Sequence, residues 1–187
     1  EGGLLTNDTA GKITISGQEG VAMYGTYGAI NPAVVTAQGL TTDRLSAALI
    51  NKGTLELADT TGATPIIGMF TNDADTEIET SGTLNIGKKS YGVYGVSNSV
   101  VMSGGTINVG EDGVGIFATG SSDKKLTSGS DVILQSGTIN VGDNQAVGVF
   151  IADDATNPLK TTVINTGTNM TVGTNAFGYV VDSKTGT

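Results

Sequence analysis

Carboxylates placed close together could perform acid–base chemistry, and the densest group of them lies in residues 71–79, TNDADTEIE. Its acids are Asp73, Asp75, Glu77 and Glu79. Enzymes that cleave acidic polysaccharides on parallel β scaffolds need carboxylates that meet across neighbouring coils, often beside a metal ion and a basic residue. Here the acids alternate around the apolar Ile78, which favours the solvent side of an edge strand over a catalytic cluster.

Other residues that could do chemistry are sparse. The chain has no His and no Cys, so the commonest general base and the thiolate metal ligands are missing. Arg44 is the sole arginine. Asp112 and Asp143 recur in only two places and lack the spacing of calcium-binding nonapeptides. We therefore expect no catalytic residue, no metal site and no cofactor, and the chain is not expected to be an enzyme.

The charge balance argues against nucleic acid as a partner. Among 187 residues, 18 acids against 9 basic residues give a formal net charge of -9. No apolar run approaches the length of a membrane span. The length suits one domain, residues 1–187, and the start at Glu1 without a signal peptide suggests a piece of a longer rod.

A repeated word organises the chain. Its first half begins at residues 12, 54, 83, 106, 138 and 169, as in TINVGE (106–111) and TINVGD (138–143). Its second half begins at residues 21, 67, 91, 114, 147 and 177, as in VGIFA (114–118). A third apolar segment precedes each later copy, at residues 48–51, 77–80, 100–102, 131–135 and 162–165. Such a period is the signature of a solenoid.

Each segment reads as a strand, because apolar residues stand two apart and are mostly β-branched, as Ile107 and Val109 are. Two copies start at Gly82 and Gly105, 23 residues apart, which suits three short strands and three corners. We predict an all-β chain: a right-handed parallel β-helix of about six coils. An antiparallel sandwich is the main alternative, and it gives no reason for one word to recur.

Insertions interrupt the repeat at fixed places. The longest spans residues 26–46, and two others are SSDKKLTSG (121–129) and ADDATNPLK (152–160). We expect all three to leave the rod at the same edge, after the second strand of a coil. The one helix-like stretch, TTDRLSAALI (41–50), is expected to end in a strand.

Equivalent residues of stacked coils form columns along the rod. The aliphatic residues on either side of Asn108, namely Ile107 and Val109, should face the core with their counterparts. Asn85, Asn108 and Asn140 should face outward, where stacked amides can bond along the rod. A structural ladder is favoured over a row of ligand-binding amides.

Aromatic residues form another column, with Tyr94, Phe117 and Phe150 among its members, each two positions after a Gly. Strict alternation puts this Gly and this aromatic on the same side. Some copies have Phe and others Tyr in this column, which suits an outward stripe because the far edge of each ring then reaches water. The hydrophobic effect, in contrast, ordinarily favours burial of large rings. We favour the outward stripe, and the inward stack stays open.

Binding, if present, is predicted on this stripe and on the inserted loops beside it. The candidate binding residues are Tyr94, Phe117, Phe150, Asp123, Lys124, Asp153 and Asp154. For the aspartates of 152–160 a solvated loop is the simpler interpretation.

The words GTINVG, GVGIFA and GVYG resemble the passenger repeats of large type V autotransporter adhesins, particularly the fusobacterial type, over nearly the whole chain from Gly11 to Val181. The resemblance implies a cell-surface β-helix anchored in the outer membrane only through a separate translocator barrel. It also implies adhesion to a host-cell or bacterial surface protein or glycan. Two alternatives remain: a glycan-binding β-helix module, and a polysaccharide lyase or hydrolase.

Overall fold

The computed structural model describes residues 4–25, 47–71, 76–96, 98–120, 131–152 and 161–182. Within these ranges the chain contains strands and turns, and no helix. The strands form three sheets of six strands each, which we name sheets A, B and C. The all-β prediction is therefore confirmed for the described residues.

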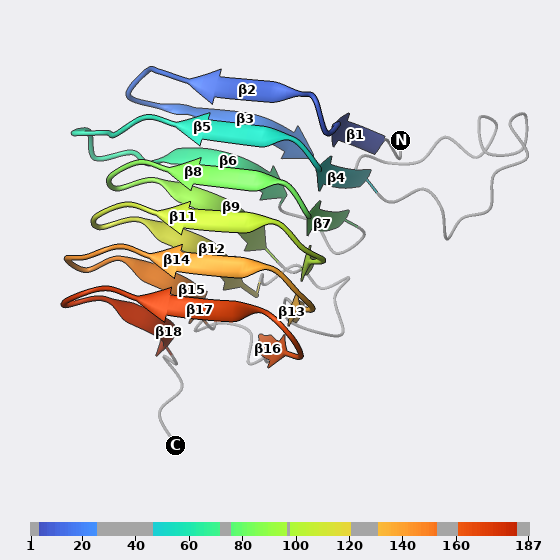
Figure 1. Cartoon of the computed structure of the whole chain (residues 1–187). Helices are drawn as coiled ribbons and strands as arrows, with labels where there is room; N and C mark the ends of the chain where they lie inside the picture. The colour runs from blue at the N-terminus through green and yellow to red at the C-terminus, as the bar shows by residue number, and fades with distance from the viewer. Residues whose placement is uncertain are drawn as a thin grey trace, which may run out of the picture.

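Each coil contributes one strand to each sheet (Figure 1). Sheet A contains β1 (Leu4–Asn7), β4 (Ala47–Asn51), β7 (Thr76–Thr80), β10 (Ser99–Met102), β13 (Asp131–Leu134) and β16 (Thr162–Asn165). Sheet B contains β2 (Lys12–Ile15), β5 (Thr54–Leu57), β8 (Thr83–Ile86), β11 (Thr106–Val109), β14 (Thr138–Val141) and β17 (Asn169–Val172). Sheet C contains β3 (Gly20–Gly25), β6 (Ile66–Thr71), β9 (Tyr91–Val96), β12 (Val114–Thr119), β15 (Val147–Ala152) and β18 (Phe177–Asp182).

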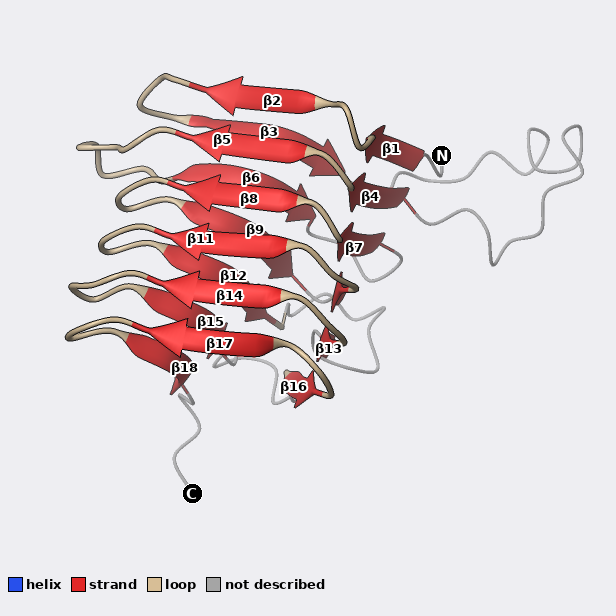
Figure 2. Ribbon diagram, viewed as in Figure 1, coloured by secondary structure: helices blue, strands red, loops and turns tan. Residues whose placement is uncertain are grey.

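The coils stack as a right-handed parallel β-helix, as predicted. In Figure 2 the chain runs along β2, turns, returns behind it along β3 and reaches β4 one level further from the N-terminal end. Seen from the N-terminal end, this path turns clockwise as it moves away from the viewer, which makes the helix right-handed. All pairings between the described strands are parallel, and β11 pairs with β8 on one side and β14 on the other. The antiparallel sandwich is thereby excluded.

Identical words pair in register, which explains why the sequence repeats. Asn108 stands opposite both Asn85 and Asn140, and Ile107 stands opposite Leu84 and Ile139. A residue that fits its column in one coil therefore fits the same column in the next coil. Repetition of the word is what keeps the columns continuous.

The core is a column of aliphatic side chains enclosed by the three sheets. Ile107 and Val109 are buried, as are their counterparts Leu55, Leu57, Leu84, Ile86, Ile139 and Val141. Sheet A adds Leu49, Ile78, Val100 and Val132, and sheet C adds Met23, Met69, Val93 and Ile116. The predicted inward columns of sheet B are confirmed.

Two details differ from the sequence interpretation. The first is that residues 4–7, LLTN, form a strand, β1, which the repeat pattern did not predict. The second concerns the acidic stretch 71–79: β7 is no edge strand, because β4 and β10 pair with its two sides. Its Ile78 is fully buried, and Glu79 lies on the outer side. The helix-like stretch ends in β4, as expected, while residues 41–46 lie outside the described ranges.

Candidate functional site

The outer face of sheet C is the candidate functional site. A bend in each of its strands determines which side chains point outward on this face. An added Cβ on Gly115 would lie 3.2 Å from Cγ2 of Val109, a core residue of sheet B. The same test on Gly92 meets the side chain of Ile86, also in the core. These glycines therefore face inward, and the residues that follow them, Ile116 and Val93, are buried in the core as well.

Strict alternation therefore fails at this point, and the prediction that Gly and aromatic share a side is wrong. Two successive residues, Gly92 and Val93, face the core, so Tyr91 and Tyr94 before and after them both face outward. At Gly115 a side chain does not fit, because an added Cβ would also lie 2.5 Å from the carbonyl oxygen of Gly148 in the next coil, while the first coil carries the small Ala22 at this position. Every coil bends at the same place, so the strands remain in register.

The aromatic residues of sheet C form a stripe on the outside of the rod, which confirms the predicted outward orientation. We define the aromatic stripe as Tyr24, Phe70, Tyr91, Tyr94, Phe117 and Phe150. Its rings contact one another in sequence along the rod. Ring centroids of Phe117 lie 4.6 Å from Tyr94, 5.2 Å from Phe150 and 5.7 Å from Tyr91, in stacked arrangements. The stacking explains why most of these rings are half-buried although they lie outside the core.

Tyr91 was not among the predicted binding residues. A signal for it is present in the sequence: the position before the inward Gly, or before Ala22 in the first copy, is apolar in every copy, as Val21, Ile67, Val114, Val147 and Phe177 show. With the aromatic outward, strict alternation would place Val114 in the core. In the structure it pairs with Tyr91 and lies outside the core cluster, covered by its neighbours to 7% exposure. The outer face of sheet C is thus two apolar columns wide.

The aromatic surroundings affect the chemistry of Tyr94. Burial among the neighbouring rings raises the pKa of its hydroxyl above the ordinary value of 10.0, and the nearby Tyr91 hydroxyl raises the pKa further. Tyr94 therefore presents a neutral hydroxyl group set among apolar ring surface. Such a face can stack on a flat apolar surface and still donate hydrogen bonds.

The predicted loop residues Asp123, Lys124, Asp153 and Asp154 lie outside the described residues. The strands that flank their loops are described, and they bear out the expected common edge. Residues 26–46, 121–130 and 153–160 each connect a strand of sheet C to the next strand of sheet A. The ends of β3, β12 and β15, where these connections begin, lie along one edge of the aromatic stripe.

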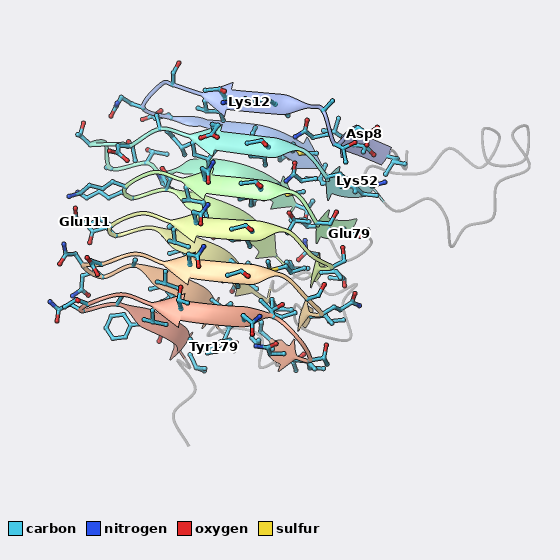
Figure 3. The ribbon with its side chains drawn as sticks, viewed as in Figure 1. Asp8, Lys12, Lys52, Glu79, Glu111 and Tyr179 are labelled. Atoms are coloured by element: carbon cyan, nitrogen blue, oxygen red, sulfur yellow. The ribbon has the colours of Figure 1, made fainter. Side chains whose placement is uncertain are left out.

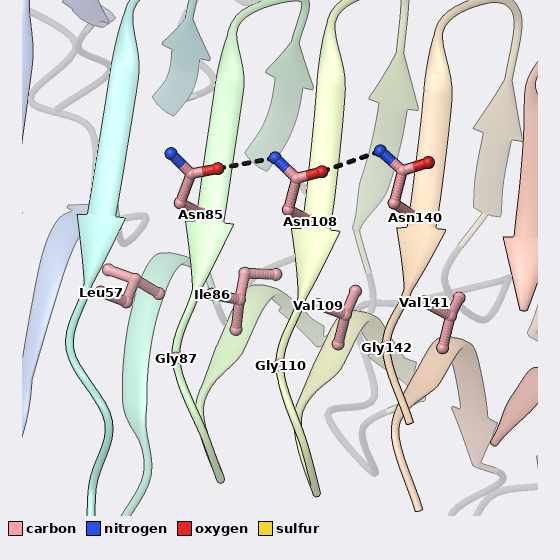
Figure 4. A pocket seen from close by; sticks show the side chains of 10 residues that line it. All are labelled: Leu57, Asn85, Ile86, Gly87, Asn108, Val109, Gly110, Asn140, Val141 and Gly142. Atoms are coloured by element: carbon pink, nitrogen blue, oxygen red, sulfur yellow. Dashed lines mark hydrogen bonds between the residues drawn. The ribbon is translucent and has the colours of Figure 1, made fainter. Parts of the chain in front are cut away.

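Sheet B carries a different outer face, a ladder of amides (Figure 4). Asn108 Nδ2 donates to Asn85 Oδ1 at 2.7 Å, and Asn140 Nδ2 donates to Asn108 Oδ1 at 2.8 Å. Asn85 Nδ2 continues the ladder to Glu56 Oε1 at 2.7 Å, and Thr171 Oγ1 donates to Asn140 Oδ1 at 3.0 Å. The ladder residues bond to one another, which supports the structural interpretation of the column.

A shallow groove of about 450 Å³ runs beside the amide ladder. Its lining includes the three ladder asparagines and the following glycines, Gly87, Gly110 and Gly142 (Figure 4). Because glycine has no side chain, the space beside the asparagine amides stays unfilled, and this space is the groove. The groove therefore follows from the repeat itself.

The described acids do not converge on a catalytic centre. Glu79 and Glu111 lie at opposite edges of the rod (Figure 3). Ser103 Oγ donates to Glu79 Oε1 at 2.6 Å, and Lys88 Nζ lies 2.9 Å from Glu111 Oε1, which raises the pKa of Lys88. Within the described ranges no three potential His, Cys, Asp or Glu ligands come close enough to hold a metal ion.

Asp112 and Asp143 occupy turns between sheets B and C. Asp112 has a φ of 54°, a left-handed conformation that Asp tolerates well. Asp143 Oδ1 accepts a hydrogen bond from the backbone N–H of Thr174 at 2.6 Å. Both acids therefore have roles in shaping turns.

The described part of the chain has no helix with the length and apolar character that a membrane crossing requires. Comparison with family models, with curated proteins and with solved structures found no match to this chain.

Proposed function

We propose that this chain is a structural and adhesive segment of a bacterial surface autotransporter passenger. The rod would hold the outer face of sheet C away from the cell, and this face would attach to a host-cell or bacterial surface protein or glycan. Support comes from the passenger-like repeat words and from one structural observation, the continuous aromatic stripe.

The aromatic stripe suits attachment because its rings offer apolar area that the fold leaves partly uncovered. Tyr and Phe are rigid side chains that lose little conformational freedom on binding, and Tyr adds a hydroxyl group. Phe117 and Phe150 lie in neighbouring coils with centroids 5.2 Å apart. A partner with flat faces repeating at a similar distance, such as the sugar rings of a glycan or a row of aromatic and aliphatic side chains, could contact several rings at once.

A rod suits display because its three continuous sheets give it one stiff axis, along which each of the first five coils adds a ring at the same angular position. The inserted loops begin beside the stripe, so they and the rings would meet a partner together. The acidic balance of -9 predicts that salt changes the binding of a basic partner.

The test is attachment of the purified chain to epithelial cells and to other bacteria, measured by flow cytometry. A double variant, Tyr94→Ser with Phe117→Ser, removes the centre of the stripe, and we expect the affinity to fall by about tenfold or more. The matched control is Ile133→Ser, which removes a half-buried apolar side chain from the outer face of sheet A. Equal attachment by the folded double variant and the control would contradict the proposal.

A glycan-binding module is the second candidate, and the same stripe favours it because aromatic faces stack on sugar rings. A glycan array separates the two. Binding to a defined glycan that the double variant loses would identify a glycan partner. Cell attachment that protease treatment of the cells abolishes, without array binding, would identify a protein partner. We do not propose catalysis, because the described carboxylates are dispersed.

A further inference from the structure

The groove beside the amide ladder lies in the middle of the rod and has an apolar floor. Four apolar side chains line it and are each 4 or 5% exposed: Leu57, Ile86, Val109 and Val141. Ile107, on the same strand as Val109, is fully buried. The groove therefore exposes a narrow strip of the core along four coils, from β5 to β14.

The fold keeps this groove open. An added Cβ on Gly110 would lie 2.8 Å from the carbonyl oxygen of Ile86, and one on Gly142 would lie 2.6 Å from the carbonyl oxygen of Val109. Both glycine N–H groups donate to these same oxygens, at 2.8 Å and 2.9 Å. A larger residue would break this packing between coils, so no side chain of the repeat fills the groove, which runs across the strands along the rod (Figure 4).

Each ladder amide uses only half of its hydrogen-bonding groups within the chain. A side-chain amide has two N–H donors, and its oxygen has two lone pairs. Asn108 donates one hydrogen bond, to Asn85, and accepts one, from Asn140. Asn85 and Asn140 likewise donate one hydrogen bond and accept one. Within the described ranges no other group bonds to these amides, so each coil keeps one donor and one acceptor for a ligand.

The spacing along the groove discriminates between kinds of ligand. Neighbouring coils are about 4.8 Å apart, so the groove repeats its donor, its acceptor and its apolar floor at that distance. An extended peptide places the side chains of one face about 6.6 Å apart and falls out of step with the coils. A sugar ring in an extended glycan covers nearly the length of one coil, and it carries hydroxyl groups at its rim and apolar C–H groups on its face.

The charge of the groove narrows the class of glycan. All residues that line the groove are uncharged, so an acidic glycan would find no cationic partner there. Beyond the end of the ladder, Glu56 Oε1 accepts a hydrogen bond from Asn85, and Lys12 Nζ lies 3.8 Å from the same oxygen. The groove therefore suits a neutral ligand.

We propose that this groove binds a linear neutral glycan, a β-linked polymer of hexose units, which lies along the rod with one sugar ring per coil. The hydroxyl groups bond to the spare N–H and lone pair of each ladder amide, and the C–H face of each ring packs on the apolar floor. The ladder bonds stay intact, so the structural role of the column and this binding role are compatible. The site lies on sheet B, and the inference is independent of the proposed adhesion through sheet C.

The experiment is an NMR titration of the isotope-labelled chain with cello-oligosaccharides, from the disaccharide to the hexasaccharide. We expect the side-chain amide signals of Asn85, Asn108 and Asn140 to shift. The affinity should rise about tenfold from the disaccharide to the tetrasaccharide and then level off, because the lining spans four coils. Oligogalacturonates of the same lengths, which are acidic, should bind about tenfold more weakly or not at all.

Asn108→Thr removes the central amide. Thr already occupies this column at Thr171, where its hydroxyl bonds to the ladder at 3.0 Å, so we expect the variant to fold. The affinity for the tetrasaccharide should fall about fivefold or more. The matched control is Thr106→Ala on the outer face of the same strand, outside the lining of the groove, and it should bind like the wild type. Circular dichroism checks folding, and Asn140→Thr replaces Asn108→Thr if that variant fails.

The stripe variant Tyr94→Ser with Phe117→Ser separates this inference from the adhesive function. It should bind cello-oligosaccharides like the wild type even where it loses attachment to cells. Loss of oligosaccharide binding in this variant would place the glycan on sheet C and overturn the groove as its site.

Three further results would overturn the proposal. The first is the absence of shifts at the three ladder asparagines at millimolar concentrations of every cello-oligosaccharide. The second is an affinity that does not depend on the length of the oligosaccharide. The third is equal binding by folded Asn108→Thr and Thr106→Ala. None of these results bears on attachment through the aromatic stripe, so the two proposals fail separately.

Discussion

Sheets B and C are both built from parallel strands, but their outer faces differ in how far their side chains satisfy one another's contacts. The amides of sheet B bond to one another, as Asn108 does to Asn85 and Asn140. The rings of sheet C also stack, yet stacking covers only part of each ring, and Tyr94 and Phe117 stay half-buried in the middle of the rod. A polar column can saturate itself along the rod, whereas an aromatic column keeps apolar area facing water. Sheet C is therefore the face that gains most from a partner.

The largest expected effect is a difference in stability between a substitution on the inner face of sheet B and one on its outer face. Ile107→Asp puts a charge into the dry core, and we expect the free energy of unfolding to fall by about 4 kcal/mol or more. Asn108→Asp puts the same group on the neighbouring outer position. It removes one donor of the ladder and should cost about 1 to 2 kcal/mol. Urea denaturation compares the two, and equal losses would show that the faces are assigned wrongly.

The next effect tests the inward bend of sheet C. Gly115→Ala places a Cβ against the carbonyl oxygen of Gly148, and we expect a loss of about 1 to 3 kcal/mol in the free energy of unfolding.

Gly104→Ala is the matched control for this bend. An added Cβ there would find its nearest neighbour at 3.7 Å, so the substitution should be tolerated. Thermal melting of the two variants side by side measures the difference. If Gly115→Ala melts with Gly104→Ala, the bend does not require glycine.

A smaller loss of stability is expected on the outer face of sheet C. Phe117→Ser removes the stacking of one ring against Tyr91, Tyr94 and Phe150, which should cost about 1 to 2 kcal/mol. The free energy of unfolding in urea measures it. A loss as large as that of Ile107→Asp would place the ring in the core.

The smallest effect concerns pH. The pKa of Tyr94 is raised in the folded chain, so the unfolded chain releases this proton first as the pH rises above 10.0. Folding stability due to this group is fully present below that pH and declines above it, until the folded residue also ionises. Tyr94→Phe should remove this part of the decline, with phenolate absorbance as the measurement. If the absorbance component that the variant loses titrates at the ordinary value of 10.0, the shifted pKa is contradicted.

Much of the fold was predictable because local periodicity and long-range repetition agree. Ile107 and Val109 stand two residues apart, which indicates that both side chains face the core. The identical TINV sequences at 106–109 and 138–141 indicate that these two strands lie side by side in neighbouring coils. The strand β1 was missed because LLTN precedes the first copy of the word and has nothing before it to match. The acids around Ile78 were read as the solvent side of an edge strand, because alternation alone cannot reveal that β7 has neighbours on both sides.

The candidate site was predicted in part. The outward position of Tyr94, Phe117 and Phe150 was favoured because Phe and Tyr exchange in this column, with the inward stack left open. The bend was not predicted, because strict alternation carries no information about two successive inward residues. Only packing against Val109 and Ile86 shows why glycine occupies that position. Tyr91 was therefore missed. The loop residues Asp123, Lys124, Asp153 and Asp154 stay predictions, since they lie outside the described residues.

The most direct test of the aromatic stripe as the binding face is hydroxyl-radical footprinting of the chain, free and attached to cells. We predict that attachment protects Tyr94, Phe117 and Phe150 from oxidation. Tyr179, an exposed tyrosine outside the stripe, should keep its reactivity. Unchanged oxidation of the three stripe residues on attached chain, with protection at other positions, would contradict the account.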